Sequence, residues 1–170
     1  GLAHTGGTGN VAIGYDSLKT VTSANYNTAL GYRALQVATG SGNTGLGQDA
    51  GDSISTGAYN ICIGNDAGQN LTSGDGNIVI GYTDAASATN DVTLKITGYD
   101  GSTTANWIAG DSSANVTLGA DLTIGDDFNM TTDSSVITFG ADSDTTLTHT
   151  DGTGLTLNGT NKLCFYDTAL

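Results

Sequence analysis

Closely spaced aspartates are the residues of this chain that best match a known chemistry. Asp126 and Asp127 are adjacent, and Asp142 and Asp144 are separated by one residue. A pair of carboxylates is what most glycosidases use, one as acid and the other as nucleophile or base. In a chain so rich in aspartate, carboxylates beside glycine and serine are explained more simply as solvated turn residues. A polysaccharide-degrading spike therefore stays as an alternative, and no catalytic residue is expected.

Other catalytic motifs are missing from the sequence. It contains no Gly-x-Ser-x-Gly elbow, no phosphate-binding loop, no His-Glu-x-x-His and no Cys-x-x-Cys. His4 and His149 have no reason to meet. Cys62 and Cys164 are predicted to be free thiols, with Cys62 packed as a small apolar residue. We therefore expect a protein that is not an enzyme and that binds no cofactor.

A repeat in the sequence predicts the secondary-structure elements that would position any functional site. A five-residue motif that begins with asparagine and ends with glycine occurs five times, and its closing glycines are 17, 16, 17 and 17 residues apart. A fixed period in this range is typical of repeat architectures. The structural repeat residues are Asn10, Gly14, Asn27, Gly31, Asn43, Gly47, Asn60, Gly64, Asn77 and Gly81.

Aligned on the closing glycine, the repeats predict a strand that is apolar on both faces. The middle position holds small residues such as Ala29 and Cys62, and the positions on either side hold mostly larger aliphatic ones. Because a strand alternates its faces, the small column points one way and the larger columns the other. Near-continuous apolar strands indicate burial on both faces. One face can line a coil, and the other needs a partner surface.

Each unit of about 17 residues is interpreted as strand, turn, strand, turn, which makes one coil of a β-solenoid. Second short strands are predicted at 15–18, 32–35 and 48–51. The asparagine column is interpreted as a stacked hydrogen-bonded ladder, with an ion or sugar site as the alternative.

In-register stacking would place Arg33 between Asp16 and Asp49, as a salt bridge, and Asp49 over Asp66. The second pair is unfavourable unless it is solvated or bridged by a cation. No metal is predicted, and Asp49 and Asp66 are the candidates for a Ca²⁺ site. Trp107 and Tyr99 are possible ligand contacts that could stack on a sugar, with a place in the core as the alternative.

Composition excludes several classes of protein. The chain has 26 glycines, no proline and a formal net charge of −13. The negative charge disfavours nucleic acid, which requires a positive surface. No apolar run approaches the roughly 20 residues of a membrane-spanning helix, so no membrane insertion is expected. Short apolar runs between Gly, Asn and Asp turns predict an all-β chain.

Residues 1–85 are assigned to the β-roll repeat region of five coils, and residues 86–170 to a second region of short strands. The period stops near Gly81, and residues 85–90 are interpreted as a junction. Candidate strands follow at 92–96, 107–109, 116–118, 122–124, 128–130, 136–139, 145–149, 155–157 and 163–166. Strands this short make a poor independent sandwich, which favours several interleaved chains in a shaft or prism.

The motif Asn-x-Ala-[Ile/Leu]-Gly-Tyr-x-[Ala/Ser]-Leu, at 10–18 and 27–35, resembles repeats of phage tail-fibre proteins. It is also similar to the YadA-like head repeats of trimeric autotransporter adhesins. The resemblance covers about residues 8–85 and implies a homotrimer of left-handed parallel β-rolls. It implies a structural and adhesive segment of a virion tail fibre that presents binding to a host-surface receptor or glycan. A bacterial trimeric adhesin, extracellular or at the cell surface, is the other alternative.

Overall fold

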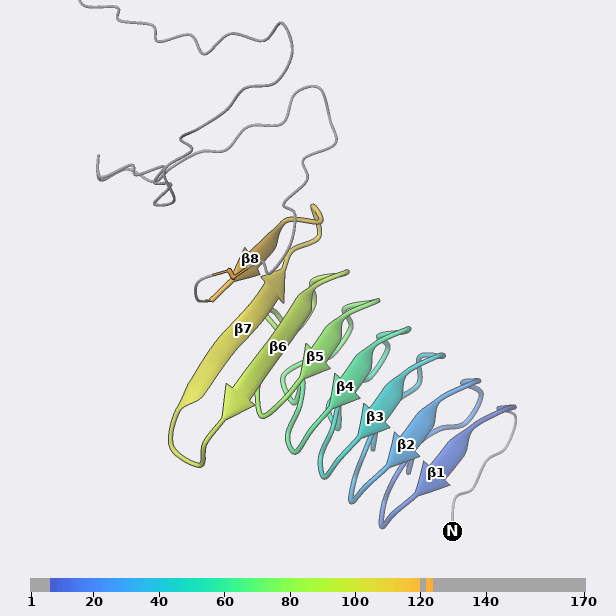
Figure 1. Cartoon of the computed structure of the whole chain (residues 1–170). Coiled ribbons are helices and arrows are strands. Elements are labelled where there is room, and N and C mark those ends of the chain that lie inside the picture. Colours follow the sequence, from blue (N-terminus) through green and yellow to red (C-terminus); the bar gives the residue numbers. More distant parts are fainter. Residues whose placement is uncertain (1–6, 120–121, 124–170) are drawn as a thin grey trace, which may run out of the picture. The chain divides into compact units, whose positions relative to one another are not determined.

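The computed structural model describes residues 7–119 and 122–123. Every regular element in this part of the chain is a strand, and the eight strands form one sheet in sequence order (Figure 1). The strands are β1 (Val11–Ile13), β2 (Thr28–Leu30), β3 (Thr44–Leu46), β4 (Ile61–Ile63), β5 (Ile78–Ile80), β6 (Leu94–Tyr99), β7 (Thr104–Gly110) and β8 (Val116–Leu118).

The first six strands stack in parallel and in register, one per turn of the chain. Ala29 of β2 lies opposite Ala12 of β1 and Gly45 of β3, and the same pairing continues to β6. The result is a β-solenoid of about five turns with about 17 residues per turn, which confirms the all-β solenoid predicted from the repeat. We call each strand with the turn that follows it a rung, numbered from β1.

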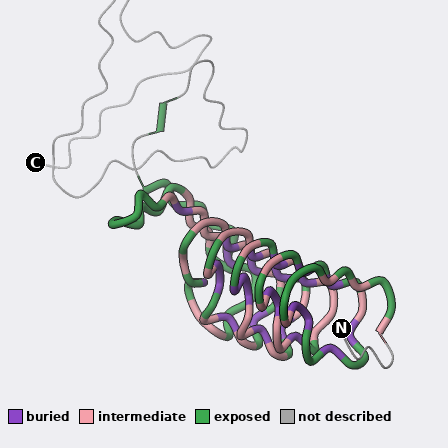
Figure 2. The backbone as a smooth tube through the Cα atoms, turned by 90° about the horizontal axis from the view of Figure 1, so that it is seen from below, coloured by how far each residue is buried: buried purple, intermediate pink, exposed green. Residues whose placement is uncertain are grey.

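The interior of the coil is filled from two sides. The small middle residues of the strands point inward, and Ala29, Cys62 and Val79 are fully buried. Leucines from the turns, such as Leu18 and Leu35, meet them from the opposite wall. Figure 2 shows these buried segments recurring in successive turns. The small column and the larger columns face opposite ways, as predicted, and the structure shows that the small column is the inward one.

The predicted second strands are wrong, because residues 15–18, 32–35 and 48–51 form turns. Asp16 and Leu18 have φ of 56° and 47°, in the left-handed region, and the corresponding residues of rungs two to four also have positive φ. A left-handed residue breaks the pleat of a strand. The backbone still bonds from rung to rung, since Leu18 N donates to Ala34 O at 3.1 Å.

The closing glycine of each repeat is required by its backbone. Gly31 has φ of 144°, and a Cβ there would collide with the carbonyl oxygen of Gly47 in the next rung. An L-residue would be strained by the dihedral angle and blocked by the neighbour. The glycine column therefore allows the rungs to approach to strand spacing, about 4.8 Å.

The stack continues beyond the last Asn-x-x-x-Gly motif. β6 pairs in parallel with β5, with Leu94 opposite Ile78. Residues 85–90, interpreted from the sequence as a junction, belong instead to the fifth turn, where the carbonyl of Ala88 accepts a hydrogen bond from Thr72 N at 2.8 Å. β7 and β8 then pair antiparallel, so the chain turns back, and up to residue 119 no further coil follows β6.

Several sequence interpretations fall outside the described residues. These are the strand beginning at 122, of which only residues 122 and 123 are described, and the strands predicted from 128 onward. The residues concerned are His4, Asp126, Asp127, Asp142, Asp144, His149 and Cys164.

Candidate functional site

The asparagine column forms a hydrogen-bonded ladder inside the solenoid. Asn60 N donates to Asn43 Oδ1 at 3.0 Å, and Asn60 Oδ1 accepts from Asn77 N at 2.9 Å. Asn60 Nδ2 donates to the carbonyl of Gly74 in the next turn at 2.8 Å. Asn60 is 0% exposed, so its amide is committed to the fold and has no surface from which to reach a ligand.

Thr93 ends this ladder. It stands where the next asparagine would be, and its N and Oγ1 both donate to Asn77 Oδ1, at 3.0 and 2.6 Å. A threonine has no amide with which to hold the carbonyl of a following turn. The change from asparagine to threonine therefore coincides with the last parallel strand of the described residues, β6.

The outward side chains of β1–β5 form an apolar strip on the surface of the single chain. Ile13 is 58% exposed and Leu30 is 42% exposed. In-register stacking aligns the outward residues of successive strands, at about 4.8 Å per rung. The strip consists of Val11, Ile13, Thr28, Leu30, Thr44, Leu46, Ile61, Ile63, Ile78 and Ile80.

An apolar hollow of about 230 Å³ extends this strip toward the end of the solenoid. It lies where β6 meets β7 and β8, and its lining includes Ile78, Val92, Leu94 and Val116. Because Ile78 belongs to both, the hollow and the strip form one continuous apolar surface.

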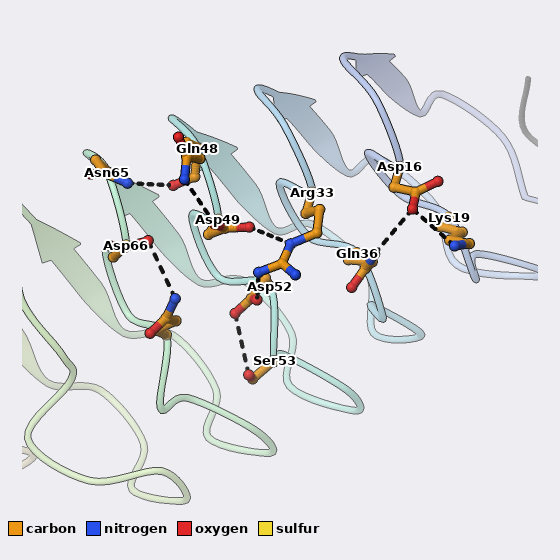
Figure 3. A network of polar contacts seen from close by, with 11 residues as sticks. Asp16, Lys19, Arg33, Gln36, Gln48, Asp49, Asp52, Ser53, Asn65 and Asp66 are labelled. Atoms are coloured by element: carbon orange, nitrogen blue, oxygen red, sulfur yellow. Dashed lines mark hydrogen bonds and ion pairs between the residues drawn. The ribbon is translucent and has the colours of Figure 1, made fainter.

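A network of charged side chains runs along the turns (Figure 3). Arg33 Nε donates to Asp49 Oδ1 at 2.6 Å, as predicted. The second predicted partner is wrong: Asp16 pairs with Lys19 at 2.9 Å, and Arg33 reaches Asp52 at 3.4 Å instead. Asp52 lies three residues beyond Asp49, so the turn brings it to Arg33. Burial raises the pKa of Asp52, and Arg33 opposes that rise.

The two metal candidates do not come together around a common centre. Asp49 is occupied by Arg33 and by Gln48 Nε2, which donates to it at 3.1 Å. Asp66 Oδ1 accepts from Gln69 Nε2 at 3.3 Å. Among the residues that the structure describes, no group of three His, Cys, Asp or Glu side chains could hold a metal ion.

The two aromatic candidates occupy different places. Tyr99 stacks on Tyr82, with ring centroids 4.6 Å apart and planes at 21°. Trp107 lies against the backbone of Gly98 and is 60% exposed. The sequence analysis missed Tyr82, although its place directly after a closing glycine, shared with Tyr15 and Tyr32, was a usable signal.

We call the positions that directly follow the closing glycines the tyrosine row: Tyr15, Tyr32, Gln48, Asn65 and Tyr82. Tyr15 and Tyr32 stack at 5.6 Å with planes at 10°. Gln48 and Asn65 interrupt the row. A polar hollow of about 110 Å³ lies beside Tyr82, the next member of the row. It is lined by Asp66, Gln69, Tyr82, Thr83 and Asp84.

Cys62 is an interior packing residue. It is 0% exposed, and burial raises the pKa of its thiol to about 12. Since the thiolate is the reactive form, this cysteine is inert at neutral pH.

In the described part of the chain, no helix is present that could cross a membrane. Comparison of the chain with protein-family models, with curated proteins and with solved structures gave no match.

Proposed function

We propose that this chain is a structural and adhesive segment of a homotrimeric fibre, of the kind found in phage tail fibres. The observation that carries the proposal is the apolar strip of β1–β5, which is continuous with the apolar hollow beside β6. Contiguous apolar surface of this kind on a soluble chain marks an interaction surface. Three solenoids packed about one axis would bury all three strips.

The solenoid suits a passive mechanical role. Parallel backbone ladders, the asparagine ladder and the charged turns repeat along one direction, so each rung is held by its neighbours. A stiff rod of this type spaces a receptor-binding tip from its base. Multiple weak contacts to a cell surface would then act together through avidity. The location that fits this role is a virion tail fibre, with a bacterial surface adhesin as the alternative.

The proposal is tested by the mass of the full chain in solution, measured by light scattering. The expected mass is three times 17.0 kDa. Replacing Leu30→Lys together with Leu46→Lys places two charges on the strip and should give a monomer, because burying an unpaired ammonium is strongly unfavourable. A stable monomer of the unmodified chain would refute the trimer.

The matched control is Thr22→Lys together with Thr56→Lys. Both threonines are exposed in turns away from the strip. This pair adds the same charge, so it should leave the mass at that of the unmodified chain.

A further inference from the structure

The polar hollow beside Tyr82, which we call the slot, lies between the rungs of Asn65 and Tyr82, and we propose that it binds one neutral sugar ring. The inference rests on the proposed fibre function and names the class of ligand that the fibre would contact. The hollow has a volume of about 110 Å³ and lies between rungs four and five. Rung four contributes Asp66 and Gln69, and rung five contributes Tyr82, Thr83 and Asp84.

The slot arises from the register of the rungs. One face of Tyr82 is covered by Tyr99 of rung six, 4.6 Å away. On the side of rung four, the row holds Asn65 in place of a third ring. Asn65 Nδ2 donates to the carbonyl of Gln48 at 3.4 Å, so this side chain is directed toward rung three (Figure 3). A flat ring in the slot would extend the Tyr82–Tyr99 stack by one member.

The rim of the slot is suited to accept hydrogen bonds from hydroxyl groups. Asp66 Oδ1 accepts from Gln69 Nε2 at 3.3 Å, and Asp84 Oδ1 accepts from Asn70 N at 3.0 Å. Within the described residues, the Oδ2 atoms of Asp66 and Asp84 have no hydrogen-bond partner. Carboxylate oxygens are acceptors only, and a bond to an ionised acceptor is among the stronger ones.

These features together select a ligand with a flat C–H face and hydroxyls around its edge, which describes a pyranose. A purely apolar ring would leave both carboxylates desolvated without partners. An acidic sugar or a phosphate would be repelled by two carboxylates on a chain of net charge −13. A metal ion is disfavoured because the described residues contain no cluster of three ligating side chains.

The test is saturation-transfer-difference NMR of the full chain with methyl glycosides of glucose, galactose, mannose and N-acetylglucosamine, and with glucuronic acid. We expect transfer to at least one neutral sugar and none to glucuronic acid. Asn65→Tyr should abolish the transfer, because it fills the slot with the residue that the repeat uses elsewhere. Tyr82→Ala should weaken binding by about threefold to tenfold, as expected for one lost aromatic contact.

The matched control is Tyr15→Ala, which removes one ring from the other stacked pair and should bind as the unmodified chain does. The inference is overturned by transfer to none of the neutral sugars, by equal transfer to glucuronic acid, or by unchanged binding in Asn65→Tyr. Equal loss in Tyr15→Ala would also overturn it. Light scattering on the same samples separates the two proposals. A trimer that binds no sugar contradicts only the proposed sugar site. A monomer that binds sugar contradicts only the proposed trimer.

Discussion

A buried amide destabilises a protein unless all its polar atoms have partners, and each asparagine of the inner column has them. Asn60 bonds to the rung before it and the rung after it, and it holds a backbone carbonyl of the following turn. No buried side-chain nitrogen or oxygen in the described residues lacks a partner. At this scale one residue type repeated every 16 or 17 positions fixes both the register and the spacing of the rungs.

Replacing Asn60→Ala tests the ladder. It removes the acceptor of Asn77 N and the donor to Gly74 O, and leaving each buried backbone group unpaired costs about 1–3 kcal/mol. We expect the free energy of unfolding to fall by about 2–5 kcal/mol in urea denaturation, and the amide of Asn77 to exchange faster with solvent. The control Asn65→Ala, at an exposed asparagine, should change stability by less than about 0.5 kcal/mol. Equal effects from the two variants would contradict the ladder.

At the scale of the element, the turns between the short strands hold the charged side chains and contribute to the core. Three-residue strands alone make marginal sheets. The left-handed turns bring Arg33 to both Asp49 and Asp52 and turn leucines such as Leu35 into the core. The turns therefore form the second wall of the solenoid.

Replacing Arg33→Met should destabilise the chain more at neutral pH than at pH 3. Burial raises the pKa of Asp52 and Arg33 lowers it, so losing Arg33 raises it further. When the pKa of a carboxyl is higher in the folded state than in the unfolded state, the folded protein becomes less stable as the pH rises. The reason is that the unfolded form gives up its proton first. Below both pKa values the carboxyl is neutral, and this contribution disappears.

The measurement is thermal unfolding of both chains from pH 3 to pH 7. Lys19→Met is the control: Lys19 is largely exposed and paired only with Asp16, so its removal should have little effect at any pH. A loss of stability in Arg33→Met that does not depend on pH would contradict the role given to Asp52.

At the scale of the whole molecule, an apolar strip and a large negative charge oppose each other. The chain has a formal net charge of −13, and a trimer would carry three times that charge. Burial of the strips would favour association, while repulsion between like-charged chains would oppose it. The balance between them depends on ionic strength.

The melting temperature of the unmodified chain should therefore rise with added NaCl, since the screening length falls from about 10 Å at 0.1 M to about 3 Å at 1 M. It should also rise with protein concentration, because unfolding of a trimer includes dissociation. Calorimetry over a concentration series measures both. The Leu30→Lys and Leu46→Lys double variant should lose the concentration dependence, and a melting temperature independent of concentration in the unmodified chain would argue against the trimer.

The sequence by itself determined the parts of the structure that follow from local periodicity. The 16- and 17-residue spacing specified the coil, and alternation along three residues specified which side chains share a face, because successive residues of a strand point to opposite faces. The left-handed turns at Asp16 and Leu18 were not predicted in this way. Aspartate tolerates positive φ but leucine does not favour it, and Tyr15-Asp16-Ser17-Leu18 fits an extended strand equally well.

In-register stacking predicted the contact between Arg33 and Asp49, but only the tertiary structure decided the other contacts between rungs. It paired Arg33 with Asp52, stacked Tyr99 of a sixth strand on Tyr82, and directed Asn65 toward the carbonyl of Gln48. These contacts depend on how each turn bends and on where parallel stacking stops, and both result from packing between residues that are far apart in the sequence. The repeat period of the sequence determines the number and length of the rungs, whereas the side-chain contacts between rungs depend on how the rungs pack in space.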